Sequence, residues 1–353
     1  MSLIMCGDEP MSALTRGFSV IGRVSIVALL MAVMMLGQSL GAGNGVADPG
    51  GTIRGFALIW NPGYNGPQIP QSLAEMANVG ANWVQFTPAW GQAASNASAI
   101  APASVTMSDD NLERAIALAH NQGLKVLLTP HVYLPAESRS AIRPDDRAAW
   151  FASYTAFITH YAAMAQRLGV EQFAVGSELA SISDDRPGWL QVIQEVRARY
   201  NGVLLYAAEP GEAERVPFWD ALDVIGIDAY FSLSGAPTSD VAALQQAWEP
   251  IRAEMAAGAA RFGRKVVFTE AGYTSQEGTT TRPNDWQLGT RPDENEQAAA
   301  YQALLATFSN EPWWEGVYWW VWNALPDDGS DHATNYSPRG KAAERVIRQW
   351  WQR

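Results

Sequence analysis

Eight short apolar runs alternate with helix-like patterns between residues 53 and 351, and this alternation is the strongest constraint on the fold. The runs are apolar at nearly every position, which is typical of strands that are buried on both faces. We place these strands at residues 54–59, 82–87, 125–129, 172–175, 203–207, 224–227, 266–269 and 316–321.

Helical patterns separate the runs. We expect helices at residues 71–79, 108–120, 145–168, 187–200, 239–262, 293–309 and 341–351, with a short one near 218–222. Eight such units over about 300 residues predict an α/β fold, a single (β/α)8 (TIM) barrel. A doubly wound sheet is the alternative, but no Gly-rich phosphate loop follows the first run.

Two local patterns concern the segment before the helix at 293–309. Asp293 and Glu296 resemble a capping box that opens this helix. The preceding residues, 271–292, are rich in Gly, Thr and Pro, and we expect that they can form a lid.

The N-terminus has the pattern of a secretory signal peptide. Arg16 and Arg23 precede an apolar run at residues 24–36, and small residues ending in Ala47 follow. We therefore expect residues 1–47 to be removed, leaving a catalytic domain at 48–353 in a secreted or periplasmic monomer without stable membrane association. The alternative is an uncleaved membrane anchor. Cys6 lies in the leader, so the mature chain has no disulfide or thiol chemistry.

Charge and composition restrict the partners. The 353 residues carry a formal net charge of −12, which argues against nucleic acid and anionic membranes as partners. The four His residues show no spacing typical of metal ligands, and we expect no metal and no cofactor. Fifteen Trp residues suggest a ligand on which flat rings can stack.

Two glutamates stand where buried strands end. Glu270 follows the run at 266–269, and Glu178 follows the run at 172–175. In a TIM barrel these ends lie together at the catalytic face. Two carboxyl groups facing each other across a cleft suit glycoside hydrolysis, in which one donates a proton and the other attacks the sugar. Each could instead be a solvated or salt-bridged strand-end residue.

Other polar and aromatic residues follow the remaining strands. Trp faces suit the apolar face of a sugar ring, and polar groups can bind its hydroxyl rim. Tyr230 can donate a hydrogen bond to the nucleophilic carboxylate. The alternatives are a structural role for His131, a role for Asp228 that only orients Tyr230, and a loop salt bridge for Glu209. The candidate substrate-binding residues are Trp60, Asn61, Trp90, His131, Ser177, Glu209, Asp228, Tyr230, Trp320 and Trp322.

Several motifs resemble those of clan A glycoside hydrolases, and more closely those of glycoside hydrolase family 113, whose known members are β-mannanases. They are NWV (82–84), PHV (130–132), FAVGSEL (173–179), PFWD (217–220), IGIDAYF (225–231), VFTEAGY (267–273) and YWWVWN (318–323). The resemblance runs from about residue 55 to 351. It implies a retaining barrel enzyme that acts on β-1,4-mannan, with Glu178 as acid/base and Glu270 as nucleophile.

The chain departs from the family pattern near the sugar subsites. Ser177 stands where the family usually has Thr, and Ala208 and Glu209 stand where Asn-Trp is expected. Residues 132–134 replace an acidic continuation after His131. Two alternatives therefore remain: hydrolysis of another β-linked glycan, such as a β-glucan or a bacterial exopolysaccharide, and a catalytically silent carbohydrate-binding barrel.

Overall fold

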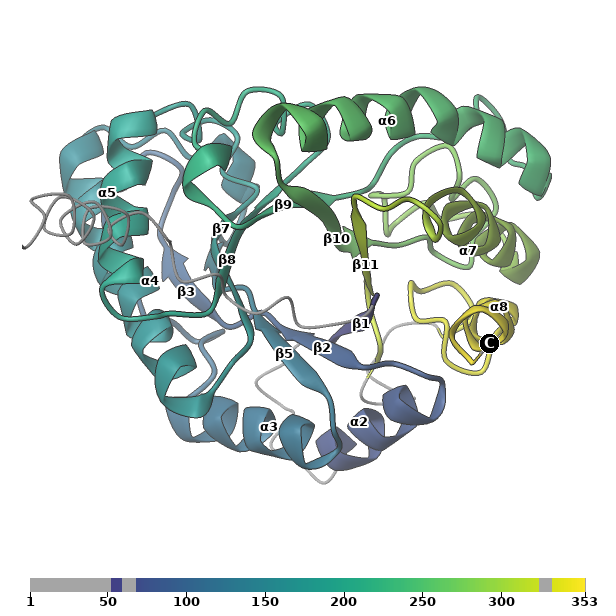
Figure 1. Cartoon of the computed structure of the whole chain (residues 1–353), viewed down its shortest axis with the longest axis horizontal. Coiled ribbons are helices and arrows are strands. Elements are labelled where there is room, and N and C mark those ends of the chain that lie inside the picture. The colour runs from purple at the N-terminus through teal and green to yellow at the C-terminus, as the bar shows by residue number, and fades with distance from the viewer. Residues whose placement is uncertain (1–51, 59–67, 324–331, 353) are drawn as a thin grey trace, which may run out of the picture. The chain divides into compact units, whose positions relative to one another are not determined.

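A closed barrel of eight parallel strands forms the core of the protein, which confirms the predicted (β/α)8 fold. The computed structural model describes residues 52–58, 68–323 and 332–352, so the predicted leader, Trp60 and Asn61 lie outside the described residues. The order around the barrel is β1-β11-β10-β9-β8-β7-β5-β2, and Figure 1 shows this ring of strands. The barrel strands are β1 (Ile53–Leu58), β2 (Trp83–Phe86), β5 (Lys125–Leu128), β7 (Gln172–Ser177), β8 (Val203–Ala208), β9 (Val224–Asp228), β10 (Lys265–Ala271) and β11 (Trp314–Trp319).

Helices surround the barrel, as Figure 1 shows. Between β8 and β9, a 3-10 helix, η2 (Trp219–Ala221), occupies the position of the predicted short helix. The α-helices are α2 (Gln68–Asn78), α3 (Asp109–Asn121), α4 (Arg147–Leu168), α5 (Arg186–Arg197), α6 (Val241–Phe262), α7 (Glu294–Phe308) and α8 (Ala342–Trp351).

Side chains fill the barrel interior. Every barrel strand contributes at least one residue to a buried cluster there. Tyr318 packs edge-on against Trp83 and donates a 3.0 Å hydrogen bond to Oε1 of Gln172, so it spans the interior. The interior is a packed core, and a substrate can bind only at its mouth. The cluster consists of Ile53, Trp83, Leu127, Ala174, Val203, Leu205, Val224, Val267 and Tyr318.

Trp319, the last residue of β11, and Trp320, which follows it, point to opposite sides of the barrel wall. Trp319 stacks on Tyr301 of α7 with ring centroids 3.8 Å apart, so it faces the helices. Trp320, the next residue, packs beside Tyr230 and Tyr336 at the barrel mouth. The predicted alternation of these two residues is present.

The long loops after β2 and β5 contain a small sheet that the sequence analysis did not predict. Its strands are β3 (Ala89–Gln92), β4 (Ile100–Ala101) and β6 (His131–Tyr133), in the order β4-β3-β6. Strands of two to four residues leave too little periodicity to be recognised. The sheet places His131 in β6, next to the mouth of the barrel.

Hydrogen bonds to α7 hold the segment at residues 271–292 in place, which corrects the expectation of a lid. Glu296, 1% exposed, accepts hydrogen bonds from the backbone N–H groups of Gly278 (2.8 Å) and Thr280 (3.0 Å) and from the Thr280 hydroxyl (2.6 Å). The Asp293 side chain caps α7 as predicted. However, Glu296 does not complete the capping box, because its carboxylate binds the segment instead.

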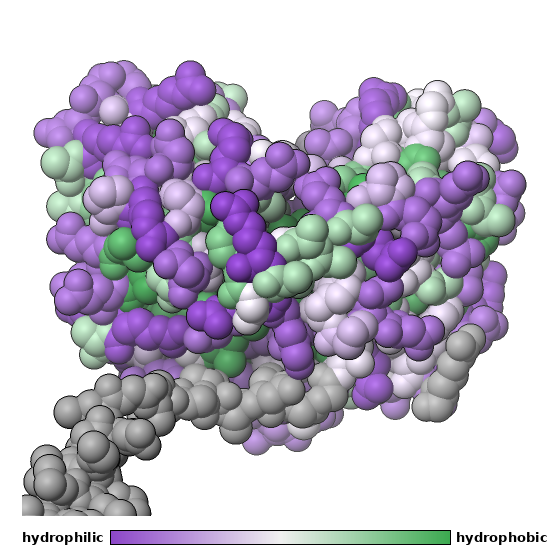
Figure 2. All heavy atoms as spheres, turned by 45° about the horizontal axis from the view of Figure 1, so that its top comes forward, coloured by the Kyte–Doolittle hydropathy of each residue, from purple (hydrophilic) through white to green (hydrophobic). Residues whose placement is uncertain are grey.

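Hydrophilic side chains cover much of the face shown in Figure 2, with smaller hydrophobic patches between them. Within the described ranges, we find no helix that is both long and apolar enough to span a membrane. The apolar run at residues 24–36 lies outside these ranges.

Candidate active site

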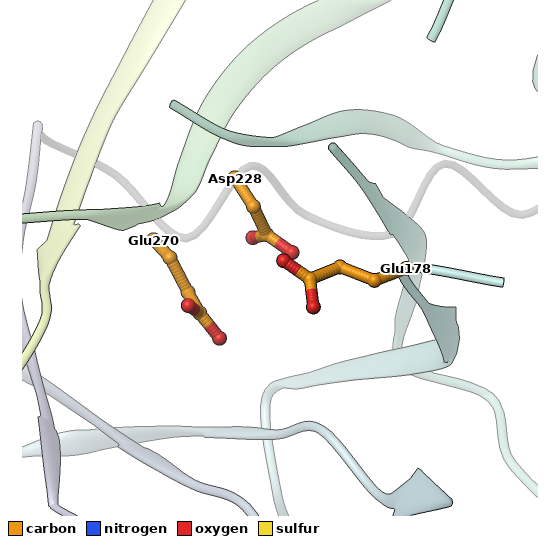
Figure 3. Close-up of side chains that lie close together, drawn as sticks. All are labelled: Glu178, Asp228 and Glu270. Atoms are coloured by element: carbon orange, nitrogen blue, oxygen red, sulfur yellow. The ribbon is translucent and has the colours of Figure 1, made fainter. Parts of the chain in front are cut away.

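Three carboxyl groups meet at the carboxyl ends of the barrel strands. Glu178 directly follows β7, Asp228 ends β9, and Glu270 is the next-to-last residue of β10. One carboxyl oxygen of each lies within 4.8 Å of those of the other two. Figure 3 shows the three side chains reaching into the same space. The structure therefore brings together three residues that the sequence predicted for the site.

Glu178 adopts a left-handed backbone conformation. Its φ is 52°, the only positive φ of a non-glycine residue in the described part of the chain. Such a conformation costs about 1–3 kcal/mol and is found mainly at functional sites. The N–H of Glu178 donates to the carbonyl of Ala207 (2.9 Å), and the N–H of Leu179 donates to the Tyr206 hydroxyl (2.9 Å). These hydrogen bonds hold the turn that directs the carboxylate into the barrel mouth.

Glu212 supports this turn, and the sequence analysis missed it. It is fully buried and accepts hydrogen bonds from the Tyr206 hydroxyl (2.6 Å) and the N–H of Glu209 (3.1 Å). Burial raises the pKa of Glu212. Its position in the loop after β8 gives no periodic signal, so only the fold reveals the chain of contacts from Glu212 through Tyr206 to the residue after Glu178.

Glu270 is nearly fully buried at the barrel mouth, with 4% of its surface exposed. The predicted hydrogen bond from Tyr230 is present, with the hydroxyl 2.9 Å from Oε2 of Glu270. Burial, and then the charge of Glu178, raise the pKa of Glu270 to about 8, while Arg139 and Tyr230 act in the opposite direction. The charge of Glu178 therefore acts on the ionisation of Glu270, as expected where two acids share a functional site.

Asp228 is fully buried between the two glutamates. Its Oδ1 accepts a 2.7 Å hydrogen bond from the hydroxyl of Thr269. Its Oδ2 has no hydrogen-bond partner in the described part of the protein. Burial, and then the charges of Glu270 and Glu178, raise the pKa of Asp228 well above its usual range. In the described part of the chain its side chain makes no hydrogen bond to that of Tyr230, which weighs against a role that only orients this tyrosine.

Arg139 is the main site residue that the sequence analysis missed. It begins a 3-10 helix, η1 (Arg139–Ala141), in the loop after β6. Its Nη2 lies 2.7 Å from Oε2 of Glu178. The loop has neither a motif nor a periodicity, so no sequence signal links Arg139 to a carboxylate from β7. The guanidinium supplies positive charge to a site that is otherwise rich in acids.

His131 lies beside Arg139 and is 8% exposed. Burial, and then the positive charge of Arg139, lower the pKa of His131 well below its usual range, so the ring is neutral. Its Nε2 has no hydrogen-bond partner among the described residues. A neutral imidazole with an unpartnered ring nitrogen can bind a sugar hydroxyl.

Two predicted subsite residues lie near Glu178. Glu209 is half-buried, and its pKa is raised to about 7, first by burial and then by the charges of Glu178 and Glu212. In the described part of the chain its side chain forms no ion pair, which weighs against the loop salt bridge. Ser177 is 2% exposed, and its Oγ has no hydrogen-bond partner within the described ranges. Both residues therefore lie close enough to Glu178 to remain candidates for the sugar subsite.

Trp320 lies one residue away from the acids, because it packs against the tyrosine that binds Glu270. It packs in one cluster with Tyr230, which binds Glu270, and with Tyr336. The rings of Tyr230 and Tyr336 lie 6.4 Å apart in an edge-to-face arrangement. This aromatic wall lies on the side of Glu270, whereas Arg139 lies on the side of Glu178.

The structure corrects the expected position of Trp322 and shows partial packing of Trp90. Trp322 is 1% exposed and packs edge-on against Phe56 at 5.0 Å, within the core between barrel and helices. Trp90 is half-buried and packs against Phe157 and His160 of α4, at 5.5 Å from each ring. Both rings are therefore used in packing. The sequence pattern shows the strand end but not the side to which each ring turns.

The fold and the site together define a class of enzyme. A (β/α)8 barrel with facing glutamates at the ends of its fourth and seventh strands has the machinery of a glycoside hydrolase. Residues 57–341 match the profile of Glycoside Hydrolase Family 113, and the chain belongs to this family.

Solved structures of the same family share the fold over most of the chain. One is described as GH113 β-mannanase AaManA from Alicyclobacillus acidocaldarius in complex with ManMIm. It is 29% identical, with a TM-score of 0.78, and the match covers 86% of this chain and 98% of that one. Another, described as GH113 β-1,4-mannanase, is 28% identical, with a TM-score of 0.78 and coverage of 86% and 99%. A search of curated proteins gave no significant match.

More distant barrels share only the fold. A family 5 glycoside hydrolase from Bifidobacterium longum subsp. longum, solved with Manβ1-4GlcNAc, is 12% identical, with a TM-score of 0.59 and coverage of 85% of this chain and 78% of that one.

Proposed function

We propose that the protein is a secreted, retaining β-mannanase in which Glu270 is the nucleophile and Glu178 the acid/base. The observation that carries the proposal is the approach of the two carboxyl groups, with one oxygen of each within 4.8 Å. Retaining glycosidases have carboxyl groups about 5–5.5 Å apart, whereas inverting ones need about 6.5–9.5 Å to admit a water molecule. The family 113 structures described as β-1,4-mannanases support the substrate.

The first step forms a covalent intermediate. Glu270 attacks the anomeric carbon, while Glu178 gives its proton to the oxygen of the leaving sugar. Tyr230 binds Oε2 of Glu270, which orients the carboxylate and leaves its other oxygen to attack. Holding the nucleophile in one orientation lowers the entropic cost of the reaction.

The second step hydrolyses this intermediate. Glu178, now a carboxylate, takes a proton from water as the water attacks the anomeric carbon and releases Glu270. Arg139, 2.7 Å from Glu178, stabilises the carboxylate that Glu178 becomes after the first step. A substrate that enters the site must compete with this ion pair.

Glu209 keeps one alternative substrate open. It stands where the resemblance leads us to expect Asn-Trp, near Glu178, with its pKa raised to about 7. A carboxyl group there changes the hydrogen bonds offered to the neighbouring sugar unit. Hydrolysis of another β-linked glycan, such as a β-glucan or a bacterial exopolysaccharide, is therefore the second candidate.

The N-terminal pattern supports export. Basic residues, an apolar run at 24–36 and small residues up to Ala47 have the order of a signal peptide. We expect the exported protein to begin at residue 48 and to be a monomer. N-terminal sequencing and light scattering of the secreted protein test both points, and a retained leader or a stable oligomer would contradict them.

Activity on a glycan panel tests the catalytic proposal. We expect the protein to release reducing sugar from β-1,4-mannan faster than from β-glucans or bacterial exopolysaccharides, and Glu270→Ala to abolish the release. Glu195→Gln is the matched control, because Glu195 is 42% exposed and pairs with Arg199 on α5. Faster cleavage of another glycan would show that this glycan, and not β-1,4-mannan, is the substrate. A variant at Glu270 with full activity would exclude this site, and a wild-type protein that binds glycans without cleaving them would indicate a carbohydrate-binding barrel.

A further inference from the structure

The inference concerns the third carboxyl group of the site, Asp228, to which double displacement assigns no step. Asp228 is fully buried at the end of β9. One of its oxygens, Oδ1, accepts a hydrogen bond from Thr269, while Oδ2 has no partner in the part of the chain that the structure describes. Figure 3 shows that the carboxyl group lies between Glu270 and Glu178 and is directed toward Glu178.

A fully ionised cluster would be costly. Three carboxyl oxygens, one from each acid, lie within 4.8 Å of one another. Like charges at this distance disfavour each other's ionised form, and a buried charge without a partner costs several kcal/mol. At least one of the three acids must therefore carry a proton when the enzyme is at rest.

The partners of each acid indicate which one holds this proton. Glu178 has the guanidinium of Arg139 at 2.7 Å, and Glu270 has the hydroxyl of Tyr230 at 2.9 Å together with the positive charge of Arg139. Asp228 has no exposure to water, and the neutral hydroxyl of Thr269 is its side chain's only hydrogen-bond donor in the described part of the chain. The charge of Arg139 also favours its ionised form, but less than the charges of Glu270 and Glu178 oppose it. Its ionised form is thus the least compensated of the three.

The groups that surround Asp228 also indicate that its ionised form is the least compensated of the three. The charged and titratable groups that face Asp228 are Glu178 after β7, Glu270 on β10 and Arg139 on η1, and only the last is positive. The pKa of Asp228 is accordingly raised well above its usual range, by burial first. Tyr230, which follows β9, donates to Glu270 and supplies nothing to the Asp228 carboxyl group.

We propose that Asp228 stays protonated through the catalytic cycle and donates a hydrogen bond from Oδ2 to the Glu178–Glu270 pair. It is a positioning residue, which acts through the two catalytic glutamates and not on the sugar. A neutral donor gives the unpartnered Oδ2 a function and adds no negative charge to the pair. Buried carboxylic acids held neutral in this way are an established means of stabilising a neighbouring anion. The inference rests on the proposed double displacement.

Two substitutions separate a neutral donor from an ionised group. In Asp228→Asn, Oδ1 can still accept from Thr269, and the amide NH2 replaces the O–H donor. We expect kcat/KM within about threefold of the wild type and an unshifted pH profile. In Asp228→Ala the donor is lost, and we expect a decrease of roughly thirtyfold. Asp110→Asn, an exposed position on α3, is the matched control and should change nothing.

Three results would overturn the proposal. A decrease of about a hundredfold or more in a correctly folded Asp228→Asn would show that Asp228 must ionise or transfer its proton. Full activity in Asp228→Ala would show that it positions nothing. Activation of the wild type by Mg²⁺, Ca²⁺ or Mn²⁺ after EDTA treatment, lost in Asp228→Asn, would make the cluster a metal site.

Infrared difference spectroscopy tests the proton without any substrate. At pH 8 the full-length wild type minus Asp228→Asn should show the carbonyl stretch of a protonated carboxylic acid, and only carboxylate bands would contradict the assignment. Circular dichroism and thermal melts verify that both variants fold. If the wild type cleaves no glycan, the proposed function fails, while the infrared result still decides whether Asp228 carries the proton.

Discussion

Nη2 of Arg139 lies 2.7 Å from Oε2 of Glu178, and the two side chains are 21% and 19% exposed. A charge pair that is this close and mostly shielded from water strongly affects the protonation of its neighbours. Arg139 comes from the loop after β6 and Glu178 from the end of β7, so the pair joins the small sheet to the barrel.

The first prediction concerns the charge of Arg139. Its positive charge lowers the pKa of Glu270, against the larger effects of burial and of Glu178 that raise it. Because the nucleophile must be ionised, Arg139→Gln should move the acidic limb of the pH profile of kcat/KM upward by about one unit. The pH dependence of initial rates checks this. Arg139→Lys, which keeps the charge, is the control, and an unmoved limb in Arg139→Gln would contradict the prediction.

The second prediction concerns the hydrogen bond from Tyr230. Removing the hydroxyl in Tyr230→Phe removes a donor that favours the ionised form of Glu270, so the pKa of Glu270 rises further. We expect kcat/KM to fall about 10–100-fold and the acidic limb to move to higher pH. Tyr200→Phe is the control, since its hydroxyl bonds to the carbonyl of Val170, before β7. Equal decreases in kcat/KM in both variants would indicate a general packing effect.

The third prediction is that Glu270, the proposed nucleophile, lowers the stability of the folded protein at alkaline pH. The pKa of Glu270 is about 8 in the folded protein, compared with about 4.3 in an unfolded chain. A raised folded pKa means that its contribution to stability is complete below about pH 4.3 and is lost as the pH rises through 8. Glu270→Gln should therefore raise the Tm by about 2 °C at pH 8.5 and by less at pH 5.

Differential scanning calorimetry at the two pH values tests this. Glu195→Gln serves as the control, because its partly exposed carboxylate lies on the outer helix α5. An increase in Tm in Glu270→Gln that is equal at both pH values, or larger at pH 5, would show that burial of Glu270 does not oppose its ionisation.

The fourth prediction concerns Trp286, which is 66% exposed in the segment at residues 271–292. This segment reaches the site through Pro283, whose carbonyl accepts a 2.6 Å hydrogen bond from Tyr336, next to Tyr230. An exposed indole in this segment can stack on a sugar unit outside the catalytic pair. Trp286→Ala should raise KM for long mannan about tenfold.

Short oligosaccharides provide the internal control for Trp286→Ala. Their kcat/KM should stay unchanged, since they do not reach beyond the aromatic wall of Tyr230 and Tyr336. Equal losses on long and short substrates would contradict an outer sugar-binding position and indicate a change in the site itself.

The barrel could be predicted because its strands are buried on both faces. Runs such as 224–227 and 266–269 are apolar without alternation, and each leads to a carboxylate at the mouth. This pattern also placed Glu178, Asp228 and Glu270 together, because parallel strands in a barrel end at the same face.

Contacts made by loops could not be predicted in this way. Arg139 and Glu212 lie in segments without periodicity, and only the folded chain brings each close to Glu178 or to the turn around it. Trp322 follows a barrel strand as Trp320 does, but packing against Phe56 directs its ring into the core. Glu296 has the spacing of a capping box, yet the buried N–H groups of the neighbouring segment compete for its carboxylate.

Trapping the glycosyl–enzyme tests the double displacement at Glu270 most directly. The protein is incubated with an activated 2-deoxy-2-fluoro-β-mannoside, digested, and analysed by mass spectrometry. We predict one fluoromannosyl group on the peptide that contains Glu270, and none in Glu270→Ala. A product of inverted configuration without any labelled peptide, or a label on another residue, would contradict Glu270 as the nucleophile.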